Sequence, residues 1–273
     1  MNKILVLGAT GKTGRRVVER LSARGLVPRH GSRSGSPRFD WEDRETWAAA
    51  LDGIERVYVS YYPDVAAPGA TDVIGAFARC AVSAGVQRLV LLSGRGEPQA
   101  AAGEQLVRES GAEWTIVRGS FFAQNFSEGF FLGSLLDGEF ALPVGGVGEP
   151  FVDAGDIADV AVAALLDDRH VGKLYEVTGP RLLTFAEATA EISRAAHRRI
   201  RYVQVSPSDY SDTLAANHVP QEYVSLLNYL FTEVLDGRNA WVADGVQRAL
   251  GREPRDFRDY VTATASAWQT GGA

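Results

Sequence analysis

Three glycines near the start of the chain are the residues whose type and spacing most clearly suggest chemistry. Gly8, Gly11 and Gly14 follow a short apolar run at intervals of three residues. The first glycine allows a tight turn, the second lets the backbone approach a pyrophosphate, and the third permits close packing of a helix on the strand. That helix would add free N–H groups and the positive end of its dipole. The pattern predicts a dinucleotide-binding loop that also includes Thr10, Lys12 and Thr13; the alternative is a strand–helix turn with incidental glycines.

The segment Arg29–Ser34 bears on which dinucleotide is bound. Sites that prefer NAD usually carry an acidic residue about 20 residues beyond the loop, where it holds the ribose 2′-hydroxyl. This segment has two arginines and no acid. A guanidinium can hold a 2′-phosphate with paired hydrogen bonds, and neighbouring hydroxyls can add to them. We therefore expect NADP(H) in preference to NAD(H), held by Arg33, Ser34 and Ser32 with help from Lys12; the alternative is a solvated basic turn.

Two later loops carry further candidate cofactor and substrate contacts. Asp40 fits a position beside the adenine, although it fits the cap of the next helix equally well. Ser60, Tyr61 and Tyr62 close an apolar run, and ligands of parallel sheets bind outside the carboxyl ends of the strands. We expect Ser60 and Tyr61 to contact the cofactor and Tyr62 to contact a flat substrate. The alternative for both tyrosines is an ordinary surface position.

The first half of the chain supplies elements that would position these residues. It alternates short apolar runs, which suit buried parallel strands, with helical stretches. This alternation implies right-handed βαβ units, so the predicted fold class is α/β, with a Rossmann-type doubly wound parallel sheet. The candidate strands are Lys3–Leu7, a weaker Leu26–His30, Arg56–Ser60, Arg88–Leu92 and Trp114–Val117, and the candidate helices are Gly14–Arg24, Arg44–Leu51, Thr71–Ala84 and Gly103–Ser110.

The second half has a different pattern and predicts a smaller C-terminal α+β lid. The stretch 138–150 is rich in glycine and proline, which indicates loops and a small β element. Thr184 followed by Glu187 predicts a capping box before a helix. We expect an NAD(P)-binding core over 1–150, with part of 151–180 completing its sheet, and a mostly helical substrate lid over 181–273. The remaining expected elements are a helix at Asp156–Leu166, strands at Leu174–Thr178 and Arg199–Val205, and helices after Ser208.

Composition excludes several classes of function. The net charge is −6, and the 28 bases comprise 25 arginines and three lysines with no basic run. Direct nucleic-acid binding is therefore not expected, since phosphate neutralisation supplies most of that affinity. No apolar stretch is long enough to span a membrane, and the first residues lack a signal-peptide pattern. The single Cys80 suits a reducing compartment, so we expect a cytoplasmic protein.

Metal and hydrolase chemistry are also poorly supported by the sequence. The four histidines are scattered, without the spacing of metal ligands, and no G-x-S-x-G turn occurs. We expect no metal.

Six segments together resemble the NmrA-like group of atypical short-chain dehydrogenases/reductases. They are GATGKTG (8–14), RHGSRS (29–34), SFFAQNF (120–126), FVDAGDIADVA (151–161), LYEVTGP (174–180) and GREPRDFRDY (251–260). The likeness runs over nearly the full length of the chain. It implies an NAD(P)H-dependent oxidoreductase with a Rossmann core, and it fixes the cofactor better than the reaction, because the group includes quinone reductases, tailoring enzymes and nucleotide-sensing regulators. Asp153 and Asp156 look like a pair of carboxylates at first sight, but the family resemblance implies that they belong to a structural turn and a helix start, where Asp156 would favour the dipole.

The proton-transfer residues usual in short-chain reductases are missing. None of the nine tyrosines has a lysine four residues later, so the Tyr-x-x-x-Lys pair is absent. Many NmrA-like reductases keep a lysine four residues before the acid that Glu104 matches, and this chain has Ala100 there. The candidates that remain after the fourth strand are Ser93 and Arg95 as catalytic groups and Gln99 as a substrate contact. Ser93 would donate to a substrate oxygen and Arg95 would stabilise developing charge; the alternatives are a helix cap and a solvated loop.

The aromatic residues of the predicted lid suggest a flat apolar ligand. Most of them must be core, and we expect two or three to contact substrate, with Phe121, Phe151 and Tyr223 as candidates beside Asn125. The resulting hypothesis is an NADPH-dependent reductase of quinones or related flat aromatic ketones. By family resemblance it would serve in aromatic polyketide tailoring beside a partner enzyme, with a reduced product that reacts with oxygen to give net hydroxylation. The alternative is a catalytically weak NAD(P)-sensing regulator that binds a transcription factor.

Overall fold

The computed structural model describes residues 3–269, which divide into two compact units. Unit 1 comprises Met1–Gly119, Ala154–Val177 and Asp244–Arg252. Unit 2 comprises Ser120–Asp153, Thr178–Ala243 and Glu253–Ala273. The division differs from the expected boundary at residue 150, because the chain enters unit 2 directly after the fifth strand. The chain then returns twice to unit 1. Residues 154–177 add a helix and the last strand of the sheet, and residues 244–252 add a short helix.

Unit 1 is built on a six-stranded parallel sheet, which confirms the predicted Rossmann-type fold. The strand order is β2-β1-β3-β4-β5-β7. The order reverses at β1, so the chain winds in both directions from this strand, and ligands of such folds bind at this switch point. The strands are β1 (Ile4–Leu7), β2 (Arg29–Gly31), β3 (Arg56–Val59), β4 (Arg88–Gly94), β5 (Glu113–Gly119) and β7 (Lys173–Val177).

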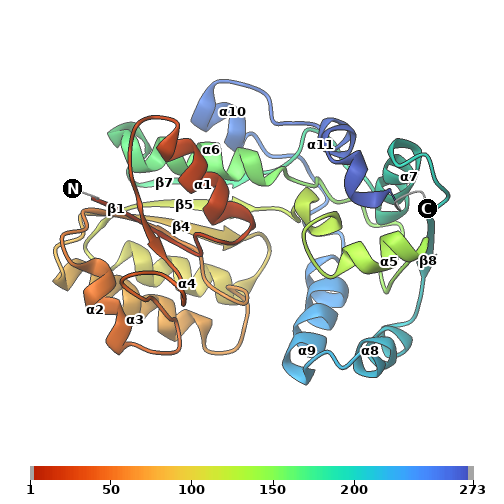
Figure 1. Ribbon diagram of the computed structural model, residues 1–273, viewed down its shortest axis with the longest axis horizontal. Helices are drawn as coiled ribbons and strands as arrows, with labels where there is room; N and C mark the ends of the chain where they lie inside the picture. The colour runs from red at the N-terminus through yellow and green to blue at the C-terminus, as the bar shows by residue number, and fades with distance from the viewer. Residues whose placement is uncertain (1–2, 270–273) are drawn as a thin grey trace. The chain divides into compact units, whose positions relative to one another are not determined.

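Helices cover both faces of this sheet (Figure 1). On one face lie α1 (Lys12–Ser22), α6 (Ala154–Leu166) and α10 (Gly245–Leu250), and on the other lie α2 (Glu45–Leu51), α3 (Ala70–Ser83) and α4 (Pro98–Arg108). The core between the sheet and α2–α3 is apolar, with Trp47 and Phe77 almost fully buried. Burial on both faces explains why the strands read as continuous apolar runs in the sequence.

Two elements of unit 1 begin three or more residues away from their predicted starts. The second strand was expected at Leu26–His30, but β2 spans Arg29–Gly31 and Val27 is 69% exposed. Helix α4 was expected from Gly103, but it begins at Pro98, which suits the first helical position because it has no N–H to leave unsatisfied. Gln99 therefore lies in the first turn of a helix rather than in a loop.

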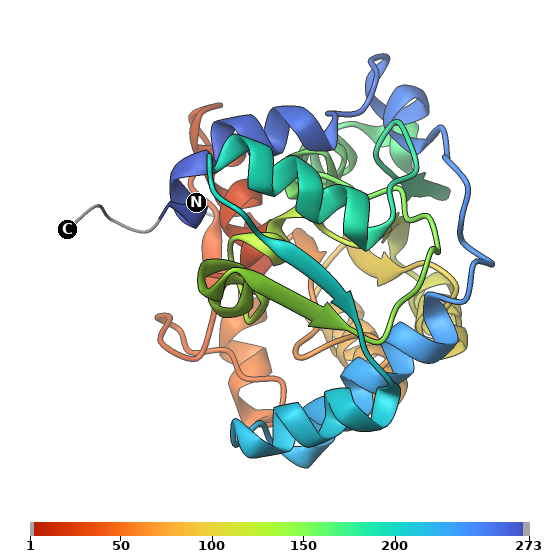
Figure 2. The same cartoon turned by 90° about the vertical axis from the view of Figure 1, so that its right-hand side faces the viewer.

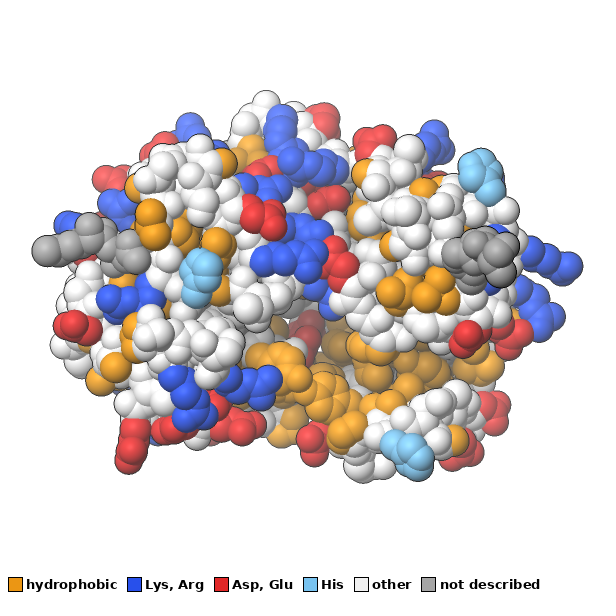
Figure 3. Space-filling view, viewed as in Figure 1, with side chains coloured by type: hydrophobic (Ala, Val, Ile, Leu, Met, Phe, Trp, Pro, Cys, Tyr) orange, Lys and Arg blue, Asp and Glu red, His pale blue; other side chains and the backbone are white. Residues whose placement is uncertain are grey.

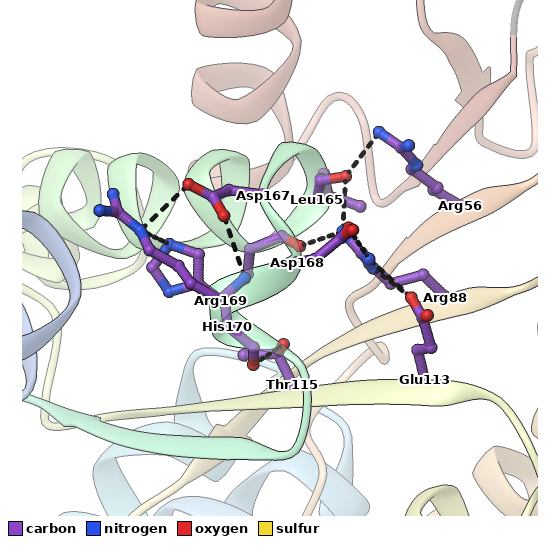
Figure 4. A network of polar contacts seen from close by, with 10 residues as sticks. Arg56, Arg88, Glu113, Thr115, Leu165, Asp167, Asp168, Arg169 and His170 are labelled. Atoms are coloured by element: carbon purple, nitrogen blue, oxygen red, sulfur yellow. Dashed lines mark hydrogen bonds and ion pairs between the residues drawn. The ribbon is translucent and has the colours of Figure 1, made fainter.

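A polar network fastens the amino ends of the strands, at the edge opposite the glycine loop (Figure 4). Arg88, at the start of β4, is 3% exposed and donates to the carboxylates of Glu113 and Asp168, each at 2.6 Å. It also donates to the Ala164 carbonyl at 3.3 Å, and Arg56 donates to Leu165 O at 3.0 Å. These bonds tie β3, β4 and β5 to the end of α6 and to the following turn, η2 (Asp168–His170).

Unit 2 contains a two-stranded parallel sheet, β6 (Glu139–Leu142) and β8 (Arg201–Gln204), with helices around it (Figure 2). The capping box predicted at Thr184 is confirmed: its hydroxyl accepts from the Glu187 amide, and the Glu187 carboxylate accepts from the Thr184 amide. The helical elements are η1 (Ala123–Phe126), α5 (Phe131–Asp137), α7 (Phe185–Ala195), α8 (Pro207–Ala216), α9 (Gln221–Tyr229), the π-helical η3 (Leu230–Val234), α11 (Phe257–Ala263) and η4 (Ala265–Trp268).

Aromatic rings fill the core of unit 2. Phe126 is fully buried and its ring lies 5.3 to 5.9 Å from those of Phe131, Phe151 and Phe185. Trp268 is also fully buried, and its indole N–H donates to the Phe126 carbonyl at 2.8 Å. Most aromatic residues of the predicted lid are therefore core, as expected. Within residues 3–269, no helix is long and apolar enough to cross a bilayer.

Candidate active site

The glycine loop closes in the geometry that a dinucleotide-binding turn requires. Gly8 has a φ of +63°, in the left-handed region that favours glycine, and its carbonyl accepts from the Gly11 amide at 2.8 Å. A Cβ on Gly14 would lie 2.1 Å from the Gly8 carbonyl oxygen, so no larger residue fits there. The Gly8 amide donates to Gly31 O at 3.0 Å, which ties the loop to the end of β2. The loop therefore lies at the switch point of the sheet.

The N-terminus of α1 completes an anion-binding cradle. Its N-cap is Gly11, which has no side chain to cap the helix, and its first turn carries no acid. The first backbone hydrogen bond of the helix runs from the Arg15 amide to the Gly11 carbonyl at 3.1 Å. The helix itself therefore supplies no acceptor for the backbone amides that precede Arg15. Together with the helix dipole, this arrangement favours a negative group. Thr10 and Gly11 are exposed, whereas Thr13 is buried. The cradle fits the pyrophosphate of NAD(P)H.

Arg33 lies in the turn after β2 and has no carboxylate partner among residues 3–269. The other two arginines near this turn are engaged: Arg29 donates to the carbonyls of Ala50 and Asp52 at 2.8 Å, and Arg38 pairs with Asp40 at 2.6 Å. The Arg33 side chain is exposed, and its guanidinium carbon lies 5.7 Å from the centre of the Tyr62 ring.

Two serine hydroxyls flank Arg33 on the same turn. The Oγ atoms of Ser32 and Ser34 are 3.5 Å apart. The Gly35 amide closes the turn by donating to Ser32 O at 3.0 Å, and a Cβ on Gly35 would lie 2.8 Å from His30 O. A guanidinium and two hydroxyls on one tight turn can hold a phosphate monoester.

The remaining predicted cofactor residues take different positions. Ser60 lies beside the glycine loop, because a Cβ on Gly8 would be 3.5 Å from its Oγ. The ring of Tyr61 lies 5.0 Å from that of Trp41, and burial raises the pKa of the Tyr61 phenol. Tyr62 is 58% exposed beneath Arg33. The Asp40 carboxylate accepts from Arg38 and from the Glu42 amide at 3.2 Å, so it stabilises the turn in which it lies.

Ser93 and Arg95, predicted as catalytic, lie in a buried ionic network at the carboxyl ends of β4, β5 and β7. The Ser93 hydroxyl donates to Glu104 Oε1 at 2.7 Å, and Arg118 holds both oxygens of that carboxylate at 2.6 Å. Arg118 also donates to Glu176 at 3.3 Å. Arg95 is 4% exposed, and its Nε lies 3.5 Å from Glu176 Oε2. The hydroxyl proton of Ser93 thus points at a carboxylate, and the guanidinium of Arg95 lies beside another.

Two carboxylates that the sequence analysis did not single out lie near this network. Glu97 ends the turn between β4 and α4 and folds back on Gly94, where an added Cβ would lie 2.2 Å from Glu97 Oε1. Its Oε2 is buried and has no hydrogen-bond partner within the described chain. Burial, and then the negative charge of Asp64, raises the pKa of Glu97 to about 8. Asp64 follows β3 and accepts from the Ala66 amide at 2.8 Å; burial raises its pKa as well.

The predicted substrate residues belong to both units. In unit 2, Phe151 is 2% exposed and packs against Phe121, Phe126 and Phe185, so it is a core residue. Phe121 is half-buried at the edge of the same cluster. Asn125 lies in η1, where its amide donates to Phe122 O at 3.0 Å, and Tyr223 is half-buried on α9. Gln99 of unit 1 is exposed, and its carbonyl accepts from Thr71 at 3.0 Å.

Comparison with known proteins agrees with the nucleotide cradle. The family model for NAD(P)H-binding proteins matches residues 8–168, and that for the NmrA-like family matches residues 99–261. The NAD(P)H azoreductase of Xenophilus azovorans is 31% identical, over 97% of this chain and 99% of its own.

Two solved structures have the same fold at low sequence identity. The triphenylmethane reductase of a Citrobacter species, solved with NADP(H), has a TM-score of 0.76 at 18% identity and covers 96% of this chain and 99% of its own. The NADPH-dependent quinone oxidoreductase of Escherichia coli, solved with NADPH, has a TM-score of 0.76 at 19% identity, over 95% of this chain and 99% of its own.

The Rossmann sheet, the glycine cradle and these relatives define the class as NAD(P)H-dependent oxidoreductases. Within that class, the chain belongs to the NmrA-like family, as the six sequence segments suggested. Among residues 3–269 no cluster of three or more histidine, cysteine or acidic side chains is arranged to hold a metal ion.

Proposed function

We propose that the protein is an NADPH-dependent reductase of quinones or related flat aromatic ketones. The observation that carries the proposal is a complete dinucleotide cradle in a chain without the Tyr-x-x-x-Lys pair. A quinone needs little acid catalysis, because aromatisation drives its reduction and the product oxyanion is a stabilised phenolate. Relatives whose names state reduction of azo compounds, triphenylmethane dyes and quinones support a flat conjugated substrate.

The preference for NADPH over NADH rests on the turn after β2. Arg33 and the hydroxyls of Ser32 and Ser34 would hold the 2′-phosphate, and Tyr62 would lie beside them at the adenosine end rather than beside the nicotinamide. The first-turn amides of α1 would hold the pyrophosphate, with Ser60 next to Gly8. NADPH, when bound, supplies a hydride.

The experiment is to follow NADPH oxidation at 340 nm with a panel of benzo-, naphtho- and anthraquinones, and with flat aromatic ketones. We expect turnover with at least one fused-ring quinone and slower turnover with NADH. Tight NADPH binding without turnover of any acceptor would contradict the proposal and would favour the nucleotide-sensing alternative instead. That alternative further predicts unequal affinity for NADP⁺ and NADPH.

The physiological role that we propose is tailoring of an aromatic polyketide beside a partner enzyme. In this role an anthraquinone-like ring is reduced by two electrons from NADPH. The hydroquinone then reacts with molecular oxygen, so that one oxygen atom enters the ring as a hydroxyl group and the other leaves as water with the two hydrogens of the hydroquinone. The measurement is mass spectrometry of the product formed under ¹⁸O₂. Incorporation of one labelled oxygen supports the net hydroxylation, whereas recovery of an unlabelled dihydro product restricts the enzyme to reduction.

A further inference from the structure

We propose that the carboxyl group of Glu97, held against Gly94 and beside Asp64 at the carboxyl ends of β3 and β4, donates the proton that completes substrate reduction. This inference rests on the proposed function and names the group that replaces the missing Tyr-x-x-x-Lys pair. In the step, a hydride carries two electrons and one hydrogen to the substrate, and Glu97 transfers its proton to the substrate oxygen. The Glu97 carboxylate then takes a proton from water.

The backbone fixes where this carboxyl group lies. Gly94 is the last residue of β4, and Gly96, with a φ of +72°, reverses the chain so that Glu97 returns over the strand end. An added Cβ on Gly94 would lie 2.2 Å from Oε1 and 2.7 Å from Cδ of Glu97, so the glutamate occupies the space that any other residue at 94 would fill. Pro98 starts α4 and limits the freedom of the turn. The carboxyl group therefore sits at the edge where parallel sheets bind their ligands.

The surroundings of Glu97 keep the proton on it at neutral pH. Its Oε2 is buried without a hydrogen-bond partner in the part of the chain that the structure describes, so no donor stabilises a negative charge on that oxygen. Asp64, from the loop after β3, raises the pKa of Glu97 further, because a like charge disfavours ionisation. The residue of β4 that contacts Glu97 is Gly94, which has no titratable side chain. The nearby guanidinium of Arg95 lies beside the Glu176 carboxylate.

Ser93 is a weaker candidate for this role, because its hydroxyl already donates to Glu104 at 2.7 Å. Glu104 in turn is held by Arg118 through both oxygens, so the Ser93 hydroxyl belongs to an ion pair that is already formed. Glu97 is thus the carboxyl group at this edge that combines an unengaged oxygen with surroundings that favour the neutral acid.

The test compares Glu97→Gln with the matched control Glu109→Gln, which changes an exposed glutamate on the C-cap of α4. With a flat aromatic ketone, whose alkoxide product must take up a proton, we expect Glu97→Gln to lower kcat about 100-fold at pH 7, the low end of the range for general acid catalysis, with unchanged affinity for NADPH. Wild-type kcat should fall as pH rises through about 8, since the protonated acid is the active form. Glu97→Gln should lose this dependence, and Glu109→Gln should keep it.

Asp64→Asn separates proton donation from a merely structural role. Without the Asp64 charge the Glu97 pKa falls, so the basic limb of the kcat profile should move to lower pH. A role in packing alone would lower activity without moving that limb. An unchanged pH profile in both Glu97→Gln and Asp64→Asn, in an enzyme that turns over, overturns the inference and leaves the proposed reductase function standing. Absence of turnover by the wild-type protein overturns both.

A second readout does not need activity. The folded protein holds the Glu97 proton between about pH 4.5 and about 8, where an unfolded chain has lost it, so the stability that this group confers falls as pH rises through that window. The Tm of Glu97→Gln relative to wild type should therefore rise between pH 5 and pH 9. A Tm difference that stays constant with pH shows an ionised Glu97 and overturns the inference.

Discussion

At the scale of single residues, we propose that Arg33 sets the preference between the two nicotinamide dinucleotides. Its guanidinium lacks a carboxylate partner within the described chain, whereas Arg38 nearby is held by Asp40 and Asp43. We expect Arg33→Ala to weaken NADPH binding by about 1.5–3 kcal/mol, the value of hydrogen bonds to a charged group, and to leave NADH binding unchanged. Calorimetric dissociation constants for both cofactors test this.

Arg38→Ala is the control, since it removes the same charge from the same loop. It should reduce affinity for NADPH much less than Arg33→Ala does. Equal losses in the two variants would mean that general electrostatic attraction, and not a specific 2′-phosphate contact, sets the preference.

At Gly14, stability and NADPH binding depend on the absence of a side chain. A Cβ there would lie 2.1 Å from the Gly8 carbonyl oxygen and 2.6 Å from the Gly8 carbonyl carbon, and backbone cannot move aside cheaply. We expect Gly14→Ala to destabilise the protein by about 1–3 kcal/mol and to abolish measurable NADPH binding, because the loop must open to admit the methyl group. Gly103→Ala, in α4, meets its nearest atom at 3.7 Å and should instead raise the Tm slightly.

At the scale of elements, the network at the amino ends of the strands predicts that loss of the Arg88 side chain lowers the stability of the protein by an amount that depends on pH. Arg88 is 3% exposed and satisfies two carboxylates and the carbonyl of Ala164. We expect Arg88→Met to cost about 1–3 kcal/mol, mainly because the buried carbonyl loses its donor. The exposed Arg24, which also carries one positive charge, is the control position for Arg24→Met.

The stability lost in Arg88→Met should be smaller in acid. The hydrogen bond from Arg88 holds the pKa of Asp168 below its usual value. The stability from this pair is present above the ordinary aspartate pKa of about 3.9 and is lost as pH falls through the lowered value in the folded protein. Urea unfolding at pH 7 and pH 3 should therefore show a smaller difference between wild type and Arg88→Met in acid. A difference that grows in acid would contradict the assignment.

The same scale shows what local sequence could predict. The parallel strands of unit 1 were predictable because burial on both faces makes them continuous apolar runs, and the Thr184–Glu187 capping box was predictable because its bonds join residues three apart. The start of α4 at Pro98 was missed because the apolar periodicity became visible only later in the helix. Phe151 was chosen as a substrate contact because its sequence shows an aromatic side chain but not the four rings around it.

Glu97 and Asp64 escaped the sequence analysis for a further physical reason. Their interaction depends on two loops that follow neighbouring strands, on a glycine that leaves room for a carboxylate, and on burial that only the folded chain creates. The one available signal was an acid in the loop after each strand. Such acids are common on protein surfaces, so this signal alone could not separate a buried acid from a solvated one.

At the scale of the whole molecule, the distribution of charged side chains bears on the kind of ligand. On the face in Figure 3, arginine and lysine side chains are interspersed with aspartate and glutamate instead of forming one basic surface. This agrees with a net charge of −6 and with the expectation that the ligand is a small molecule rather than nucleic acid. Binding energy is therefore expected to come from local cradles such as the glycine loop.

Division into two units makes the effect of NADPH on the whole chain a further prediction. The glycine cradle and the Arg33 turn both belong to unit 1, so NADPH should protect its amides first, from Gly11 to Gly14 and from Ser32 to Gly35. At a concentration of about 100 times Kd, a ligand that binds only the folded state adds about 2.7 kcal/mol. For a chain of this size that corresponds to a rise in Tm of about 5–10 °C. Calorimetry and hydrogen exchange with and without NADPH measure both effects.

Arg33→Ala should need a proportionally higher NADPH concentration for the same rise in Tm. Protection confined to the β6–β8 sheet of unit 2 would show that the cofactor binds elsewhere.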